Sequence, residues 1–241
     1  MKEREVYAEI RAPLPLIIRI DGRNFQRFLE EKGFQKPYDR RFAEAMANAT
    51  ELFFKRSGFH PELAYIFSDE VSFFFREVPF NSRIEKLDSV VASFFASALT
   101  IILGADEPLS FDARVIPICE HELVEYLAWR QAEAWRNHVN SYGYYTLRRE
   151  GLSGEEAQKR LKGMKASEIH EMLFSKGINV AETPAWQRRG ILVAWERYEK
   201  EGTDARSGKR TKAVRKRVVQ LWDLPIFKSE EGRALLKRIL E

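Results

Sequence analysis

Cysteine, histidine and an excess of one charge are all scarce in this sequence of 241 residues. The single cysteine, Cys119, excludes an internal disulfide framework and a cysteine-rich zinc site, and its place after an apolar stretch predicts a small buried thiol. The four histidines show no HExxH pattern or other metal-binding spacing. Forty basic and 36 acidic residues leave a formal charge of +4, so only the distribution of charge can indicate a nucleic-acid partner.

Long apolar segments and common nucleotide-binding patterns are missing as well. Ser89–Ala105 has no charge, but its seventeen residues fall short of the roughly 20 apolar residues of a membrane span. It predicts a buried core helix, because its apolar residues recur at helical spacing. These residues are Val91, Phe94, Phe95, Ala98 and Ile102. Residues 1–5 are charged and lack the apolar core of a signal peptide, so we expect a cytoplasmic protein. The absence of GxxxxGK[ST] and GxGxxG argues against a P-loop enzyme and a Rossmann domain.

A content of 44% hydrophobic and 32% charged residues supports a packed core with a soluble surface. Apolar runs and helical stripes predict the order β-α-β-β-α-β, which is the split βαβ or ferredoxin-like arrangement of an α+β fold. The expected elements are strands at Leu16–Ile20, Leu63–Phe67, Val71–Arg76 and Phe111–Ile118, and helices over 39–57 and 83–103. In this topology the third strand lies between the first two, so Asp21 and Asp69 are predicted to meet at one edge of the sheet.

The second half of the chain predicts a mainly helical extension. We expect a long helix over Glu122–Glu150, a helix capped by Ser153, another capped by Ser167, and a strand at Gly190–Trp195. Arg206–Arg217 holds seven basic residues and no acidic one. We divide the chain into a catalytic core over residues 1–130 and a helical, basic region over 131–241 that packs on the core.

Two carboxylates at one sheet edge are the minimum for holding Mg²⁺ together with a triphosphate. Gly22 lets the backbone approach a ligand closely, so its carbonyl is a further possible ligand. Glu70 is a ligand, a group that supports one, or an ion-pair partner of Arg19 or Arg23. The alternative is that Asp21-Gly22 is an ordinary turn and Asp69-Glu70 an exposed hairpin tip.

Several basic residues are candidates for contacts with phosphate. Near the first strand these are Arg19, Arg23, Arg27 and Lys36, which otherwise only solvate a helix face. Trp129, Ala132 and Arg136 share one side of the long helix, which suits base stacking and phosphate contact or a core tryptophan with surface arginines. The basic run suits an RNA backbone or a solvated loop. The candidate RNA contacts are Arg130, Arg136, Asn137, Lys209, Arg210, Lys212, Arg215 and Arg217.

Seven motifs in order resemble those of the tRNA-His guanylyltransferase family, in the branch of Thg-like archaeal and bacterial proteins. They are Arg19–Phe25, Phe34–Asp39, Ser68–Phe73, Phe111–Val115, Trp129–Ala132, Gly177–Asn179 and Trp186–Gly190, and the similarity runs from about residue 4 to 225. The eukaryotic members carry His-Ile-Asn where this chain has Trp135-Arg136-Asn137, and Gln26 stands where histidine is frequent. Both guanylate addition to tRNA-His and template-dependent repair of tRNA 5′ ends therefore stay open.

The resemblance implies a core like the palm of polymerases and a 3′–5′ nucleotidyltransferase that acts on an activated tRNA 5′ end. It implies two Mg²⁺ ions on Asp21, Gly22 and Asp69, with Glu70 as a further catalytic residue, GTP and ATP as substrates, and a homotetramer built as a dimer of dimers. The implied nucleotide contacts are Asp21, Gly22, Arg23, Asn24, Phe25, Gln26, Lys36, Ser68 and Asp69. The competing hypotheses are a nucleotidyl cyclase with a similar core and a non-catalytic tRNA-binding protein.

Overall fold

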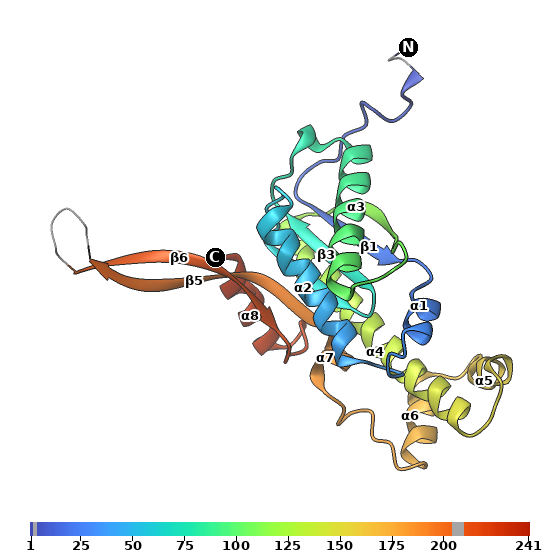
Figure 1. Ribbon diagram of the computed structural model, residues 1–241. Coiled ribbons are helices and arrows are strands. Elements are labelled where there is room, and N and C mark those ends of the chain that lie inside the picture. Colours follow the sequence, from blue (N-terminus) through green and yellow to red (C-terminus); the bar gives the residue numbers. More distant parts are fainter. Residues whose placement is uncertain (2–3, 204–209) are drawn as a thin grey trace.

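The computed structural model describes residues 1, 4–203 and 210–241, in which six strands form one antiparallel sheet (Figure 1). The order across the sheet is β4-β1-β3-β2-β5-β6. The strands are β1 Leu16–Gly22, β2 Leu63–Phe67, β3 Glu70–Phe75, β4 Phe111–Pro117, β5 Ile191–Thr203 and β6 Arg210–Leu221. A mixed α/β fold with an antiparallel sheet, as expected from the sequence, is thus present.

The centre of the sheet positions the predicted carboxylates. β3 lies between β1 and β2 and is antiparallel to both, so the C-terminal end of β1 lies beside the tip that joins β2 to β3. Asp21 is opposite Glu70 in the strand register, and the backbone N–H of Gly22 donates to the carbonyl of Asp69 at 3.2 Å. The prediction that Asp21 and Asp69 meet is confirmed.

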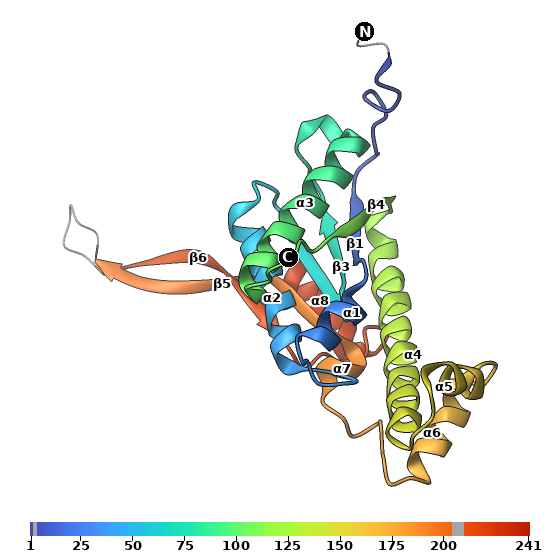
Figure 2. The ribbon, with the colours of Figure 1, turned by 45° about the vertical axis from the view of Figure 1, so that its right-hand side comes forward.

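Helices cover both faces of this sheet (Figure 2). α2 Arg40–Arg56 and α3 Ile84–Leu103 pack on one face, and α4 Leu123–Arg149 and α8 Glu230–Leu240 contribute to the core on the other. Every residue of β2 and β3 is buried, because both faces of these strands are covered. Within the described residues, α3 alone is long and apolar enough to cross a membrane, but Leu87, Val91 and Phe95 are fully buried in the core.

The shorter helices depart from the expectations. They are α1 Phe25–Glu31, α5 Gly154–Leu161, α6 Ala166–Phe174 and α7 Ala185–Arg189, with 3₁₀ turns at Phe80–Ser82 and Glu120–Glu122. α5 has the expected capping box at Ser153. The prediction that Ser167 caps the next helix is wrong, because α6 already begins at Ala166 and Lys165 precedes it. α1 and α7 had no predicted counterpart.

The C-terminal half also extends the sheet. β5 pairs with β2 over Leu63–Ile66 and then runs outward with β6 as a long hairpin, which projects from the body in Figure 1. Most of the predicted basic run is therefore a strand, and residues 206–209, including Lys209, lie outside the described residues. The division at residue 130, which stays a prediction, would fall inside α4.

Cys119 is exposed, so the expectation of a buried thiol is wrong. β4 ends at Pro117, and the chain then leaves the sheet for the 3₁₀ turn at Glu120–Glu122. The backbone N–H of Cys119 donates to the Glu122 carboxylate at 2.6 Å, which fixes this surface turn. An apolar stretch before a cysteine thus does not bury it when the strand ends first.

Candidate active site

The end of β1 and the tip that leads into β3 bring two carboxylates close together. Burial, and then the neighbouring Asp112 carboxylate, raise the pKa of Asp21. Burial, and then the Asp21 carboxylate, raise the pKa of Asp69. Neither carboxylate forms an ion pair with a Lys, Arg or His of the described residues. Like charges in a partly buried site are costly, so this pair favours either protonation or a bound cation.

Gly22 is required by the close packing at this point. A Cβ added there would lie 2.4 Å from a ring carbon of Phe25 and 2.8 Å from a carboxylate oxygen of Asp69. The Asp69 carboxylate therefore lies directly against the Gly22 backbone. Its orientation is set by Ser68, which has a φ of 51° in the tight turn and donates its hydroxyl to the Asp69 carboxylate at 3.0 Å.

This arrangement fits a hard divalent cation that shares its ligands with a substrate. No group of three or more His, Cys, Asp or Glu in the described ranges could hold a metal ion alone. Asp21, Asp69 and the adjacent Gly22 carbonyl supply oxygen donors, and Mg²⁺ commonly completes its shell with waters and phosphates. The raised pKa of both carboxylates, neither of which forms an ion pair among the described residues, is the observation that supports this fit.

Glu70 forms its ion pair with Arg130, and not with the predicted Arg19 or Arg23. Its two carboxylate oxygens accept hydrogen bonds from Nε and Nη2 of Arg130 at 2.8 and 2.6 Å, and both side chains are more than nine-tenths buried. Ion pairs with Arg19 or Arg23 are thus not observed. This pairing also corrects the role of Arg130, because a buried guanidinium that is engaged by Glu70 is not available as a surface contact for RNA.

A cavity of about 340 Å³ lies beside Asp69, which is at the lower end of the sizes typical of ligand pockets. Its polar lining includes Ser68, Asp69, Lys36 and Asn137, and Phe34 and Tyr145 add aromatic surface. Burial lowers the pKa of Lys36, and the Asp69 carboxylate acts in the opposite direction. A cation, two aromatic rings and a carboxylate in one cavity suit a nucleoside triphosphate.

The other predicted nucleotide contacts divide into two groups. Gln26 lines the cavity, and Phe25 does so with only 4% of its surface exposed while its ring packs on Phe42 and Phe111. Arg23 and Asn24 are exposed and do not line the cavity; Asn24 has a φ of 61° and leads into α1. Of the predicted segment Arg23–Gln26, Phe25 and Gln26 thus line the cavity.

The cavity also contains residues that the sequence analysis missed. Asn140, Ser141 and Tyr145 line it from α4 together with the predicted Asn137. The spacing of Asn137, Ser141 and Tyr145 at intervals of four was the available signal, because such residues share one face of a helix. Arg136 instead forms an ion pair with Glu133 on the exposed side of α4.

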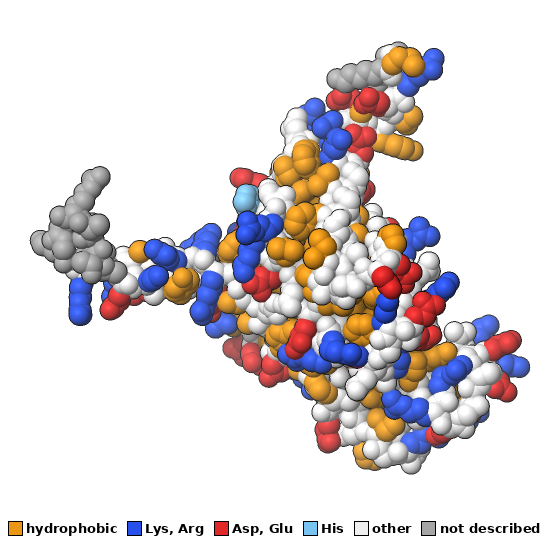
Figure 3. All heavy atoms as spheres, in the orientation of Figure 1, with side chains coloured by type: hydrophobic (Ala, Val, Ile, Leu, Met, Phe, Trp, Pro, Cys, Tyr) orange, Lys and Arg blue, Asp and Glu red, His pale blue; other side chains and the backbone are white. Residues whose placement is uncertain are grey.

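The remaining predicted RNA contacts lie on β6, away from the cavity. Arg210, Lys212, Arg215 and Arg217 are all exposed, and Figure 3 shows basic side chains along the hairpin. Lys212 pairs with Glu199, and Arg217 pairs with Glu196. Arg210 and Arg215 have no ion pair among the described residues, so they are the most available for an anionic partner.

The chain is similar in sequence to proteins that are named tRNA(His) guanylyltransferases. A family model for tRNAHis guanylyltransferase matches residues 1–119, and one for the Thg1 C terminal domain matches residues 121–224. A probable tRNA(His) guanylyltransferase of Mus musculus is 35% identical over 200 residues, which are 78% of this chain and 67% of that protein. The tRNA(His) guanylyltransferase of Debaryomyces hansenii is 33% identical over 223 residues, 84% and 83% of the two chains.

A solved structure is also similar to this chain, and its name agrees with those of the relatives. A bacterial tRNA(His) guanylyltransferase (Thg1)-like protein in complex with GTP has a TM-score of 0.71 and 25% sequence identity, and the alignment covers 100% of this chain and 96% of that one. Together with the carboxylate pair and the adjoining cavity, these similarities define a nucleotidyltransferase. The chain belongs to the tRNA(His) guanylyltransferase family, whose members are nucleotide-binding transferases of tRNA processing.

Proposed function

We propose that this protein is a Mg²⁺-dependent 3′–5′ nucleotidyltransferase that extends the 5′ end of tRNA, by guanylate addition to tRNA-His or by template-dependent repair. The observation that carries this proposal is the close pair Asp21 and Asp69, neither in an ion pair among the described residues, with Asp69 in the lining of a cavity of about 340 Å³. The strand order β4-β1-β3-β2 is that of a split βαβ core, which supports a palm-like catalytic domain.

The cavity residues hold the incoming nucleotide, GTP above all. Lys36 neutralises charge on the triphosphate, and Asn137 and Ser141 offer hydrogen bonds to the base or ribose. Bound Mg²⁺ on Asp21, the Gly22 carbonyl and Asp69 supplies charge neutralisation for the phosphates and activation of a hydroxyl. ATP or GTP first activates a 5′ monophosphate, unless the end already carries a triphosphate.

In this proposal the 5′ end of the tRNA approaches Asp21 from the side opposite the nucleotide cavity. Arg19 points from the same face of β1, lies 5.7 Å from the centre of the Trp129 ring, and has a buried Nη1 without a hydrogen-bond partner. A guanidinium beside Asp21 suits the negative charge of the activated 5′ phosphate. The 3′-hydroxyl of the held nucleotide then attacks the activated 5′ phosphate and loses its proton, a new O3′–P bond forms, and the bond to the activating group breaks, so that AMP, GMP or pyrophosphate leaves.

The direct test is incorporation of radiolabelled GTP into tRNA-His and into 5′-truncated tRNAs. We expect extension by the natural protein with Mg²⁺, none by the double variant Asp21→Ala and Asp69→Ala, and normal extension by Asp106→Asn, an exposed control that pairs only with Lys32. Tight tRNA binding without turnover would instead indicate a binding protein. A cyclic product from the nucleotide alone would indicate a cyclase.

The proposal has three further parts. We place the exposed cations of β6 against the tRNA backbone, and we expect a homotetramer in the cytoplasm. Light scattering of the purified protein measures the assembly. The ratio of activity on full-length tRNA-His to that on truncated tRNAs distinguishes guanylate addition from repair.

A further inference from the structure

A wide groove opens directly from the nucleotide cavity. It has a volume of about 930 Å³, against about 340 Å³ for the cavity itself. The two hollows share Gln26, Asn140, Ser141 and Tyr145, so whatever lies in the groove lies next to a nucleotide in the cavity. Its continuity with the cavity suits a polymer strand that passes beside the held nucleotide.

One face of α5 forms the far wall of this groove. Glu155, Gln158 and Lys159 line it from one side of the helix, and Lys162 lines it from the position directly after the last helical residue. Lys159 and Lys162 are exposed and have no ion pair among the described residues. With Glu155 the wall holds two cations against one carboxylate, and this net positive charge favours an anionic occupant.

The wall on α4 adds an aromatic surface. Tyr144 lines the groove and packs edge-on against Tyr145, with 5.0 Å between the ring centres. Near the start of α5, the Tyr144 hydroxyl lies 3.0 Å from the point where a Cβ of Gly154 would stand. α5 and α4 are therefore in close contact at one end of the groove, and the half-buried Tyr144 lines the same groove as the two lysines. Aromatic rings beside free cations are typical of single-stranded RNA sites.

We propose that this groove holds the 3′ strand at the acceptor end of a tRNA, an assignment that rests on the proposed function. A nucleotide added at the 5′ end lies opposite the last nucleotides of the 3′ strand. That strand must then pass beside the nucleotide cavity, and the groove is the hollow that opens from it. Lys159 and Lys162 contact its phosphates, Tyr144 stacks on an unpaired base, and Asn140 and Ser141 lie between the strand and the held nucleotide.

The test compares a tRNA transcript with an intact 3′ end and the same transcript without its unpaired 3′ nucleotides. The natural protein should bind the intact transcript about tenfold more tightly, the order expected for one stacked base with phosphate contacts. The double variant Lys159→Gln and Lys162→Gln should lose most of this difference, and its salt dependence should be lower by about 1.4 in slope for two single-strand phosphate contacts. Tyr144→Leu should reduce the difference without changing the slope.

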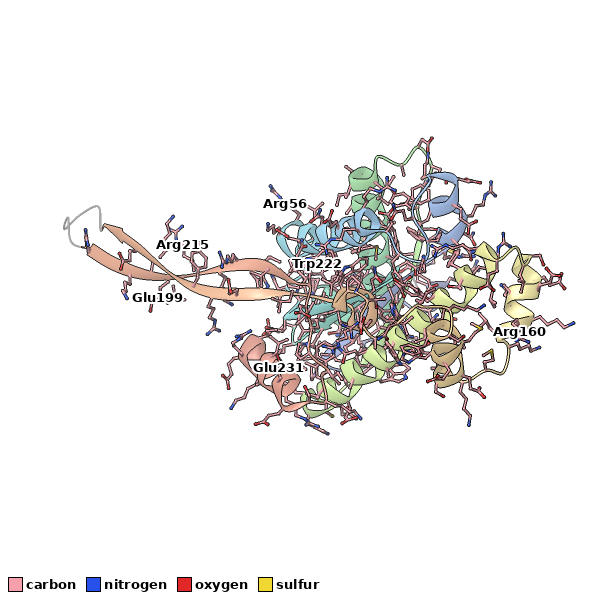
Figure 4. The ribbon with its side chains drawn as sticks, turned by 90° about the horizontal axis from the view of Figure 1, so that it is seen from below. Arg56, Arg160, Glu199, Arg215, Trp222 and Glu231 are labelled. Carbon is pink, nitrogen blue, oxygen red and sulfur yellow. The ribbon has the colours of Figure 1, made fainter. Side chains whose placement is uncertain are left out.

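Arg160→Gln is the matched control for Lys159→Gln. Arg160 lies on the same helix and has the same charge, but it does not line the groove and projects outward from α5 (Figure 4). We expect Arg160→Gln to keep the full difference between the two transcripts. Equal losses for both single variants, or a natural protein that binds both transcripts equally, would overturn the proposal. These binding measurements need no turnover, so a protein that fails to extend any tRNA refutes the proposed function separately.

Discussion

The carboxylate pair Asp21 and Asp69 and the β5–β6 hairpin both carry charge of mostly one sign, but the two regions differ in burial. Burial raises the pKa of both aspartates, so their charge is costly to the fold. The cations of β6 are exposed, and Lys212 and Arg217 have acidic partners on β5. Charge that is partly withdrawn from water can drive chemistry, whereas exposed charge is screened and suits contacts with any RNA sequence.

Asp69→Asn should give the largest separation between activity and stability. We expect GTP incorporation to fall by about 10²–10³-fold or more, as when one preorganised electrostatic group is removed. The melting temperature should stay the same or rise, because the neutral amide relieves the repulsion with Asp21. Incorporation assays and thermal unfolding measure the two effects. A fall in both would show that Asp69 is structural.

Arg130→Met tests buried charge against exposed charge. The Arg130–Glu70 side chains are 8% and 9% exposed, whereas those of Arg217–Glu196 are 61% and 44% exposed. Breaking the buried pair should lower the free energy of unfolding by about 3–5 kcal/mol. Arg217→Met should cost less than about 1 kcal/mol. Denaturant unfolding measures both, and adding Glu70→Gln to Arg130→Met should restore most of the loss.

Lowering the pH should affect the carboxylate pair Asp21 and Asp69 but leave the charge of the β5–β6 hairpin unchanged. Asp21 and Asp69 have raised pKa values in the folded protein, so they take up protons at a higher pH than in the unfolded chain. Their contribution to stability therefore increases as the pH falls, while metal binding and activity decrease. Arginine keeps its charge, so the hairpin should hold tRNA over the same range. Unfolding, GTP incorporation and tRNA binding across a pH series measure the three trends.

Arg215→Gln should give the smallest effect. Arg215 is exposed and without an ion pair among the described residues, so its loss should weaken tRNA binding a few-fold and lower the salt slope by about 0.9. Stability should change by no more than about 0.5 kcal/mol. Glu199→Gln frees Lys212 from its partner and should strengthen binding (Figure 4). Equal affinities for both variants would remove the hairpin from the tRNA site.

The sequence predicts elements well where periodicity is strong. β1, β2 and β3 are continuous apolar runs between turn residues, and their topology was sufficient to bring Asp21 and Asp69 together. β6 could not be predicted in the same way, because basic residues interrupt its apolar positions. Its strand structure comes from backbone pairing with β5 along its whole length, a long-range contact without a local signal.

The partner of Glu70 shows the same limit inside the site. Arg19 and Arg23 were the expected partners because they flank the carboxylates in the sequence motif. Arg130 lies 60 residues after Glu70, and only the packing of α4 across the sheet brings the two together. The cavity residues Asn140, Ser141 and Tyr145 reach the site by the same helix. The spacing of residues within α4 could be read from the sequence, but the packing of α4 across the sheet could not.

α4 therefore fixes the spacing of the residues along the whole site. Its 27 residues span about 40 Å, and they carry Arg130 at the carboxylates, Ser141 in the nucleotide cavity and Tyr144 in the groove. The distances between these residues are therefore fixed by the turns of one helix and not by flexible loops. One residue inserted between Arg130 and Ser141 would rotate everything beyond it by about 100° and misalign the nucleotide with the carboxylates.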